Sequence, residues 1–253
     1  MVDDLREDGF LGGRLRIVQP ARGYRAGADA VMLAAACPAR AGQSALELGC
    51  GAGVAMLCLG ARVPGLRLAG LEVQPAYAEL ARRNAAANAI AAELHQGDLA
   101  RMPAALRDRD FDHVIANPPY FLDGPSAPDA GRGLARHEQV PLALWVRAGL
   151  RRLRPGGWLT LIQRADRLAA VLAALDGRAG AITILPVAAR QGRDAGRVIV
   201  AARKGARAPL RLLSPFVMHE KPSHSADAED LTAAAQAVLR EGASLSLGGR
   251  DSR

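Results

Sequence analysis

Asn117-Pro118-Pro119-Tyr120 follows a short hydrophobic run at residues 111–116 and combines hydrogen-bond acceptors with an aromatic ring. The Asn117 side-chain oxygen and the Pro118 carbonyl can each accept one N–H of an amino group. Because prolines have a fixed φ and no N–H, they hold these acceptors rigidly. An amino group on a planar ring is a weak nucleophile, and two acceptors favour the pyramidal nitrogen of its transition state. Tyr120 offers a face for stacking a base. We therefore predict that this stretch is catalytic.

An ordinary turn is the alternative explanation for this stretch, because Asn-Pro opens turns and Pro-Pro stiffens linkers. Its position after a predicted strand, downstream of a predicted ligand-binding set, favours catalysis.

That ligand-binding set begins with Gly49, Gly51 and Gly53, where a buried strand turns into a helix. Glycines allow a tight turn and close approach of the backbone to a ligand at the helix N-terminus. A dinucleotide-binding fingerprint requires glycine or alanine three residues beyond Gly51 or Gly53, but Val54 and Met56 stand there. Nicotinamide binding is therefore disfavoured.

Two carboxylates follow the next two predicted strands. Glu72 comes about 20 residues after the glycines, as expected for a group that accepts hydrogen bonds from both ribose hydroxyls. Asp98 is placed to accept from an adenine amino group, while the Leu99 backbone N–H reaches the ring. Each feature alone also fits an ordinary turn, a solvated strand end or a helix cap. Their joint order and spacing favour a ligand with a free ribose.

The elements that position these residues are short apolar runs alternating with Ala-rich helical stretches, which predicts an α/β fold with a doubly wound, mostly parallel sheet. Residues 181–190 and 198–205 form a predicted hairpin, so the last strand should be antiparallel. Residues 12–36 predict a short extended segment and a helix from near Asp29. We expect a lid at residues 1–40, the main domain at 41–215 and a partly flexible C-terminal extension at 216–253.

Composition limits the remaining possibilities. The chain has 253 residues, half of them hydrophobic, and no apolar run reaches the roughly 18 residues of a membrane span. The N-terminus is acidic rather than basic, so we expect a cytoplasmic protein. The three cysteines show neither metal spacing nor a redox pair, and we expect no metal and no disulfide. A net charge of +8 favours an anionic partner such as RNA.

Residues 40–205 resemble the class I S-adenosylmethionine-dependent methyltransferases, whose Rossmann-like sheet has seven strands with the last antiparallel. The resemblance implies S-adenosyl-L-methionine as cofactor, with the glycine loop around its methionine part and Glu47 supporting the methionine amine through that loop. Asn-Pro-Pro-Tyr is the signature of family members that methylate exocyclic amines of bases or glutamine amides. The cofactor-binding candidates are Arg25, Gly27, Asp29, Glu47, Gly49, Cys50, Gly51, Gly53, Glu72, Val73, Asp98, Leu99 and Asn117. The catalytic candidates are Asn117, Pro118, Pro119 and Tyr120.

Nearly the whole chain also resembles the bacterial valine-tRNA adenine-37 N6-methyltransferases. The resemblance implies transfer to adenine N6 in the tRNA anticodon loop. A glutamine-amide methyltransferase, a methyltransferase of another RNA base and a non-catalytic RNA-binding relative are the alternatives. That family has a tyrosine near its C-terminus where His224 stands here, so the exact RNA stays open. The sequence also leaves open the target nucleotide, the role of the loop 121–138 and the oligomeric state. Candidates for phosphate binding are Arg132, Arg136, Arg190, Arg193, Arg197, Arg203, Lys204 and Arg207.

Overall fold

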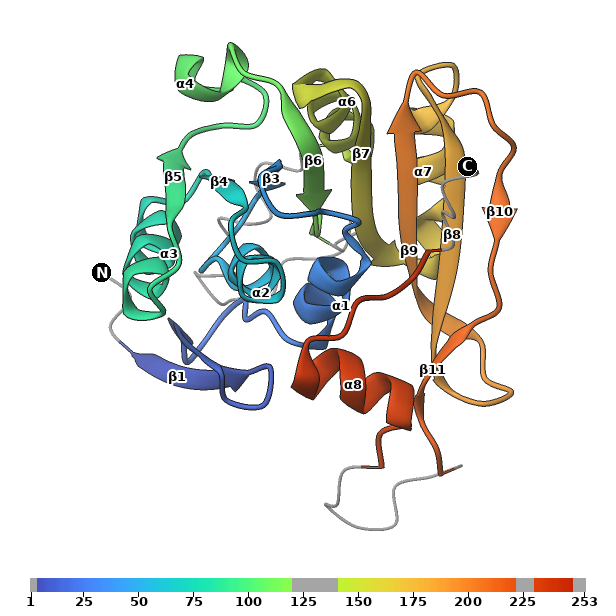
Figure 1. The fold of residues 1–253 in the computed structure, drawn as a ribbon, viewed down its shortest axis with the longest axis horizontal. Coiled ribbons are helices and arrows are strands. Elements are labelled where there is room, and N and C mark those ends of the chain that lie inside the picture. The colour runs from blue at the N-terminus through green and yellow to red at the C-terminus, as the bar shows by residue number, and fades with distance from the viewer. Residues whose placement is uncertain (1–3, 120–140, 222–229, 248–253) are drawn as a thin grey trace, which may run out of the picture.

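The computed structural model describes residues 4–119, 141–221 and 230–247, and Figure 1 shows their arrangement. The helices are α1 (Ala28–Ala36), α2 (Val54–Arg62), α3 (Pro75–Ala87), α4 (Ala104–Arg107), α6 (Leu142–Arg152), α7 (Leu168–Leu175) and α8 (Ala233–Glu241). The strands are β1 (Leu5–Phe10), β2 (Leu15–Pro20), β3 (Ser44–Leu48), β4 (Arg67–Glu72), β5 (Ala92–Gln96), β6 (Phe111–Ala116), β7 (Leu153–Arg164), β8 (Ala179–Arg190), β9 (Ala195–Lys204), β10 (Arg211–Leu212) and β11 (Phe216–His219).

The main sheet has the order β10-β8-β9-β7-β6-β3-β4-β5, with β11 also paired to β8. β9 pairs antiparallel with β7 and β8, and the other pairings in this sheet are parallel. Seven of these strands, β3 to β9 in chain order, form the predicted mostly parallel sheet, and the last of them, β9, is antiparallel as predicted. The short strands β10 and β11 extend the sheet beyond that prediction.

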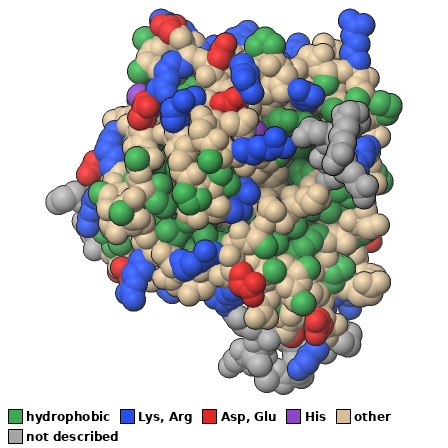
Figure 2. Space-filling view, viewed as in Figure 1, with side chains coloured by type: hydrophobic (Ala, Val, Ile, Leu, Met, Phe, Trp, Pro, Cys, Tyr) green, Lys and Arg blue, Asp and Glu red, His purple; other side chains and the backbone are tan. Residues whose placement is uncertain are grey.

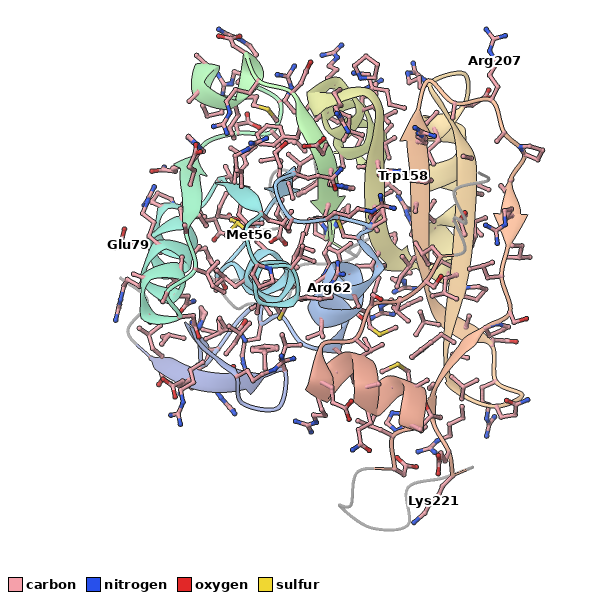
Figure 3. The ribbon with its side chains drawn as sticks, viewed as in Figure 1. Met56, Arg62, Glu79, Trp158, Arg207 and Lys221 are labelled. Carbon is pink, nitrogen blue, oxygen red and sulfur yellow. The ribbon has the colours of Figure 1, made fainter. Side chains whose placement is uncertain are left out.

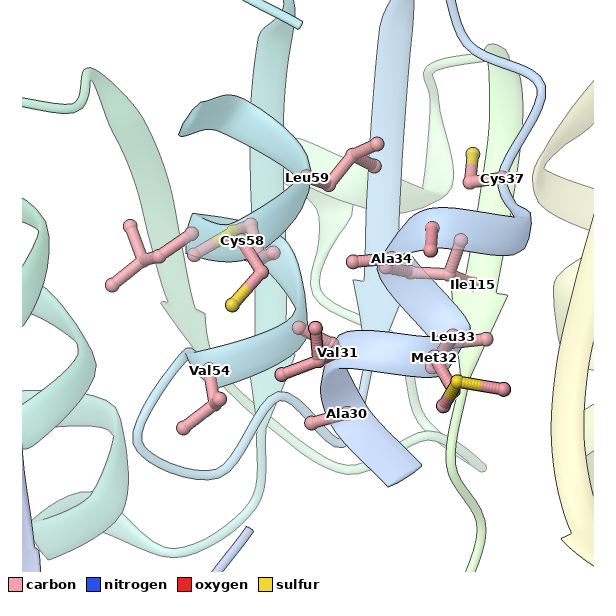
Figure 4. Packing of buried hydrophobic residues seen from close by; sticks show 14 of the residues in the cluster. Ala30, Val31, Met32, Leu33, Ala34, Cys37, Val54, Cys58, Leu59 and Ile115 are labelled. Atoms are coloured by element: carbon pink, nitrogen blue, oxygen red, sulfur yellow. The ribbon is translucent and has the colours of Figure 1, made fainter. Parts of the chain in front are cut away.

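Helices cover both faces of this sheet. On one face α1 packs against α2, and Figure 4 shows Val31 and Ala34 of α1 among Val54, Cys58 and Leu59 of α2. Arg62, the last residue of α2 (Figure 3), donates from Nη2 to the carbonyl oxygens of Ala34 and Cys37 at the end of α1, at 2.9 and 2.5 Å. On the other face α6 packs against α7 over a second apolar cluster. The glycine loop and the end of β6 are therefore anchored to a buried scaffold.

The predicted extended segment before α1 is confirmed as β2, but its pairing with β1 in a hairpin was not predicted. Asn84 of α3 and Asn88, the residue that caps this helix, explain how the hairpin is held. The Asn84 amide accepts from the Val18 N–H at 2.9 Å and donates to the Val18 carbonyl at 3.0 Å. Asn88, one turn later, makes the same pair of hydrogen bonds with Arg16. These side chains satisfy backbone groups on one edge of β2 as a neighbouring strand would. Asn84 also donates to the Ala52 carbonyl at 2.9 Å, which ties the hairpin to the glycine loop.

The predicted boundaries at residues 40 and 215 stay predictions. Helix α1, inside the predicted lid segment, is buried in the same cluster as α2, and α8 of the C-terminal extension packs against α1. None of the helices in residues 4–119, 141–221 and 230–247 is both long and apolar enough to cross a membrane.

Candidate active site

The candidate site lies where the sheet order reverses. β3 pairs with β4 on one side and with β6 on the other, and Leu48 is in register with Ala116. The next residues, Gly49 and Asn117, therefore leave adjacent strands at the same edge of the sheet. Open α/β sheets bind ligands at such a switch point. The structure thus brings the glycine loop and the start of the Asn-Pro-Pro stretch together, as the sequence predicted.

The glycine loop depends on backbone conformations that favour glycine. Gly49, Gly51 and Gly53 have φ angles of +65°, +54° and +88°, in the left-handed region. The loop is held to β4 by two backbone donors: the Cys50 N–H bonds to the Leu71 carbonyl at 3.0 Å, and the Gly51 N–H to Glu72 Oε2 at 2.9 Å. Helix α2 then begins at Val54, so its N-terminus faces the loop.

Two buried carboxylates support this loop. Glu47 is only 4% exposed and accepts the Met56 N–H at 2.8 Å, while Glu72 is 6% exposed and accepts Gly51 and Gln74 N–H groups on its two oxygens. Burial raises the pKa of Glu47 to about 8, and the charge of Glu72 adds to the rise. Burial also raises the pKa of Glu72. A positively charged ligand nearby would stabilise the ionised forms of these two buried carboxyl groups. The sulfonium and ammonium groups of S-adenosylmethionine carry such a charge.

Asp98 and Leu99 lie after β5, next to the end of β4. The Gly97 N–H donates to the Glu72 carbonyl at 2.9 Å, so this turn adjoins the residue proposed for the ribose. Asp98 Oδ1 accepts the Ala100 N–H at 2.7 Å, and its other oxygen lies 3.5 Å from Arg101 Nε. The Leu99 side chain packs against the second apolar cluster. Val73 is exposed directly after Glu72. Their contacts with a cofactor stay predictions.

The segment between β2 and α1 contributes a residue that sequence reasoning missed. Arg25 pairs with Asp8 of β1 at 2.7 Å, and Asp29 pairs with Arg197 of β9 at 3.0 Å, while Gly27 caps α1. Tyr24 instead reaches the site. Its Cε1 would lie 3.8 Å from a Cβ built on Gly51, and its hydroxyl oxygen lies 3.5 Å from Asn117 Nδ2. No spacing rule marks such a residue, because it comes from a distant part of the chain.

The described part of the Asn-Pro-Pro-Tyr stretch ends at Pro119. Asn117 is partly exposed, Pro118 is buried, and the Pro118 carbonyl accepts from Gln163 Nε2 at 3.4 Å. Gln163 of β7 is a second residue that sequence reasoning missed, and it is 2% exposed. Tyr120, the loop 121–138 and His224 lie outside the described residues.

Comparison with known proteins assigns this arrangement to a family. A family model described as the methyltransferase small domain matches residues 27–175, which include the glycine loop, both carboxylates and the Asn-Pro-Pro-Tyr stretch. The chain belongs to the methyltransferase small domain family. It is therefore a methyltransferase, as the sequence resemblance predicted.

Individual relatives agree with this assignment. A Porphyromonas gingivalis protein named tRNA1(Val) (adenine(37)-N6)-methyltransferase is 36% identical over 170 residues, covering 64% of this chain and 67% of the relative. A relative of the same name from Aeromonas hydrophila subsp. hydrophila is 29% identical over 205 residues, 79% of this chain and 85% of the relative. A crystal structure from Agrobacterium tumefaciens, described as a predicted O-methyltransferase, aligns with a TM-score of 0.70 and 30% identity over 86% of this chain and 98% of that chain.

The methyltransferase also packs a tryptophan against its glycine loop. Trp145 of α6 is buried, and a Cβ built on Gly49 would lie 2.5 Å from Trp145 Cη2. Gly49 therefore serves two purposes, since a larger residue would be strained at φ +65° and would overlap the indole.

Four of the phosphate-binding candidates make contacts inside the methyltransferase. Arg190 Nη1 pairs with Asp230 at 2.8 Å, and Arg197 pairs with Asp29. Arg203 and Lys204 donate to the backbone carbonyls of Gly156 and Leu153. Arg132 and Arg136 lie outside the described residues, and Arg207 projects from the edge of the molecule in Figure 3. These contacts give the four residues structural roles, and phosphate binding stays a prediction for the set.

Proposed function

We propose that this methyltransferase transfers a methyl group from S-adenosylmethionine to N6 of an adenine in tRNA, at position 37 of the anticodon loop. The observation that carries the proposal is the pair of hydrogen-bond acceptors, Asn117 and Pro118, at the end of β6 next to the glycine loop. The names of the Porphyromonas gingivalis and Aeromonas hydrophila relatives support the substrate.

The cofactor site in this proposal is formed by the ends of β3, β4 and β5. S-adenosylmethionine supplies an electrophilic methyl group on a positively charged sulfur. Glu72 uses one lone pair of each oxygen for the Gly51 and Gln74 N–H groups, which leaves lone pairs for two ribose hydroxyls. Asp98 accepts from the adenine amino group, the Leu99 N–H reaches the ring, and Glu47 supports the loop around the methionine part.

The chemistry assigned to the second half of the site is alignment of the nucleophile. Asn117 Oδ1 and the Pro118 carbonyl accept the two hydrogens of the adenine amino group, which directs the nitrogen lone pair at the methyl carbon. The N–C bond forms as the S–C bond breaks, and the bonding electrons stay on sulfur. The methylated nitrogen then carries a positive charge and releases one proton to water. Tyr120 stacks on the base.

The same acceptors favour an amine over an alcohol. An amino group brings two hydrogens for two acceptors, whereas a hydroxyl group has one hydrogen and requires a base to remove it. We therefore infer N-methylation, although one solved relative is described as a predicted O-methyltransferase.

RNA is the favoured substrate class because of the net charge of +8 and the names of the relatives. Figure 2 shows arginine and lysine side chains spread over the face in view, and most numerous along its upper edge near α4 and α6. An anticodon-loop base is unpaired or easily unstacked, so it can enter the site at modest cost.

The test is to incubate the protein and S-adenosylmethionine with unmodified total tRNA, rRNA, duplex DNA and release factors, and to identify the methylated product by mass spectrometry. We expect N6-methyladenosine in tRNA, formed at a rate that falls steeply as salt rises. Asn117→Ala should lower turnover by about 10²-fold or more with cofactor affinity near wild type. Methylated glutamine, N4-methylcytosine or N2-methylguanosine as the product would overturn the substrate assignment.

A further inference from the structure

Tyr24 lies between the glycine loop and Asn117. Its side chain adjoins Gly51, and its hydroxyl oxygen is 3.5 Å from Asn117 Nδ2. Its backbone carbonyl accepts the Tyr77 hydroxyl at 3.0 Å, so α3 holds the segment in place. The residue is nevertheless 49% exposed. A half-exposed aromatic side chain held at both its backbone and its hydroxyl group is placed to act on a neighbour rather than to fill the core.

In the structure the Asn117 amide faces Tyr24 with its NH2 group. The Asn117 NH2 group donates toward the Tyr24 hydroxyl oxygen, so Oδ1, on the other side of the Cβ–Cγ axis, faces away from Tyr24. Partial burial of the ring and the carboxylates of Glu47 and Asp29 raise the pKa of Tyr24, so its hydroxyl stays neutral near pH 7. If the amide were reversed, its NH2 group would oppose the N–H groups of an incoming amine.

Gln163 acts on the second acceptor in a similar way. In the parallel pair β6–β7, the last residue of β6, Ala116, is in register with Leu161. Pro118 follows Ala116 by two positions, as Gln163 of β7 follows Leu161. Gln163 Nε2 donates to the Pro118 carbonyl at 3.4 Å, while its Oε1 accepts the Arg164 N–H at 2.8 Å. The Gln163 amide is therefore held at both ends. A carbonyl oxygen has two lone pairs, so the Pro118 carbonyl keeps one for a substrate.

We propose that Tyr24 and Gln163 are positioning residues, which hold Asn117 Oδ1 and the Pro118 carbonyl in the orientation that the amino group of the substrate requires. The inference rests on the proposed N-methylation, because only an amine uses both acceptors. Neither residue touches the reacting atoms, and each acts through the acceptor that it contacts.

The first test uses Tyr24→Phe, which removes the hydroxyl but keeps the ring beside Gly51 and the carbonyl that binds Tyr77. We expect the single-turnover rate of tRNA methylation to fall about 3- to 10-fold, as for loss of one hydrogen bond, with cofactor affinity unchanged. In an Asn117→Ala background, Tyr24→Phe should cause no further loss, because the group that it orients is gone. Equal losses in both backgrounds would overturn the role of Tyr24.

The second test uses Gln163→Glu, which keeps the shape and the acceptor for Arg164 but replaces the donor to Pro118 with an oxygen. The variant should be impaired at high pH and recover relative to wild type as pH falls, because a protonated carboxyl can donate to the Pro118 carbonyl. Gln43→Glu is the matched control, because Gln43 directly precedes β3, at the end of that strand away from the glycine loop. This variant should show no such recovery. A pH-independent ratio of Gln163→Glu to wild-type rates would overturn the role of Gln163.

A readout without substrate separates this inference from the proposed function. In ¹⁵N-labelled protein, Tyr24→Phe should shift the Asn117 side-chain NH2 resonances, because one of its hydrogens loses an acceptor. If these resonances shift but wild type methylates no RNA, the proposed substrate is wrong and the positioning contact stands. If wild type methylates tRNA and the resonances do not shift, Tyr24 does not position Asn117.

Discussion

Replacing Glu72 by glutamine should weaken cofactor binding, because the glutamine side chain lacks both the negative charge and one of the two acceptor oxygens of the carboxylate. The Glu72 carboxylate is almost completely buried, and it accepts backbone N–H groups of Gly51 and Gln74 at 2.9 Å each. A glutamine amide has one oxygen, so its NH2 group must face one of these donors. A ribose hydroxyl that would bond to the buried carboxylate then loses a charged acceptor, at a cost of about 1.5 to 3 kcal/mol, which corresponds to about a 10- to 150-fold rise in Kd.

Calorimetric titration with S-adenosylmethionine and with S-adenosylhomocysteine measures this loss directly. Both ligands contain the ribose, so Glu72→Gln should weaken both to a similar extent. Glu79→Gln is the matched control, since Glu79 is an exposed carboxylate on α3 that points away from the molecule in Figure 3. Unchanged affinity of Glu72→Gln for both ligands, in a folded variant, would refute the assignment of Glu72 to the ribose.

Three further predictions concern the scaffold of the site. The pKa of Glu47 is about 8 in the folded state against 4.5 for the free side chain. Preferential protonation of the folded state therefore adds to the free energy of unfolding at pH 4.5 and below, and this contribution is lost as pH rises from 4.5 through 8. Urea denaturation should therefore show that Glu47→Gln gains stability relative to wild type between pH 5 and pH 8, and a constant difference would contradict the burial argument. Gly49→Ala should destabilise the protein by about 1 to 2 kcal/mol from its backbone conformation alone, and by more from overlap with Trp145. Adding Trp145→Phe should recover part of that loss in thermal unfolding, and strict additivity of the two changes would contradict the contact. Asn84→Ala should lower the free energy of unfolding in urea by about 2 to 4 kcal/mol, because three backbone groups lose a hydrogen-bond partner. A smaller loss than in Asn88→Ala would contradict the role of Asn84 as the residue that ties the hairpin to the glycine loop.

The fold and the approximate place of the site were predictable because their signals are local. The strand-to-helix turn at Gly49, the carboxylate ending β4 and the stretch after β6 each appear within a few consecutive residues. Parallel pairing then brings the ends of neighbouring strands to one edge of the sheet. The alternation of apolar runs with helices indicated that sheet before any contact was known.

The supporting contacts were not predictable, because each joins residues far apart in the sequence. Tyr24 and Asn117 are separated by 93 positions, and Gln163 and Pro118 by 45. The predicted extended segment within residues 12–36 is confirmed by β2, but the side chain that satisfies its edge, Asn84 of α3, lies 66 positions from Val18. Single side chains carry no periodicity, so neither pattern nor composition marks them.

Excess positive charge does not by itself assign a role to an individual residue. Arginines predicted to bind phosphate include Arg190 and Arg197, which the fold uses in ion pairs with Asp230 and Asp29. Net charge describes the field around a protein, whereas the role of one arginine depends on the neighbours that the fold provides.

The central claim, methylation of adenine N6 at position 37 of tRNA, is tested most directly with two synthetic valine-tRNA anticodon arms. One carries adenosine at position 37, and the other carries inosine, which has an oxygen in place of the amino group. With S-adenosylmethionine and the wild-type protein, mass spectrometry should find one added methyl group at N6 of position 37 in the first arm and none in the second. Equal methylation of both arms, or methylation at another position, would contradict the account.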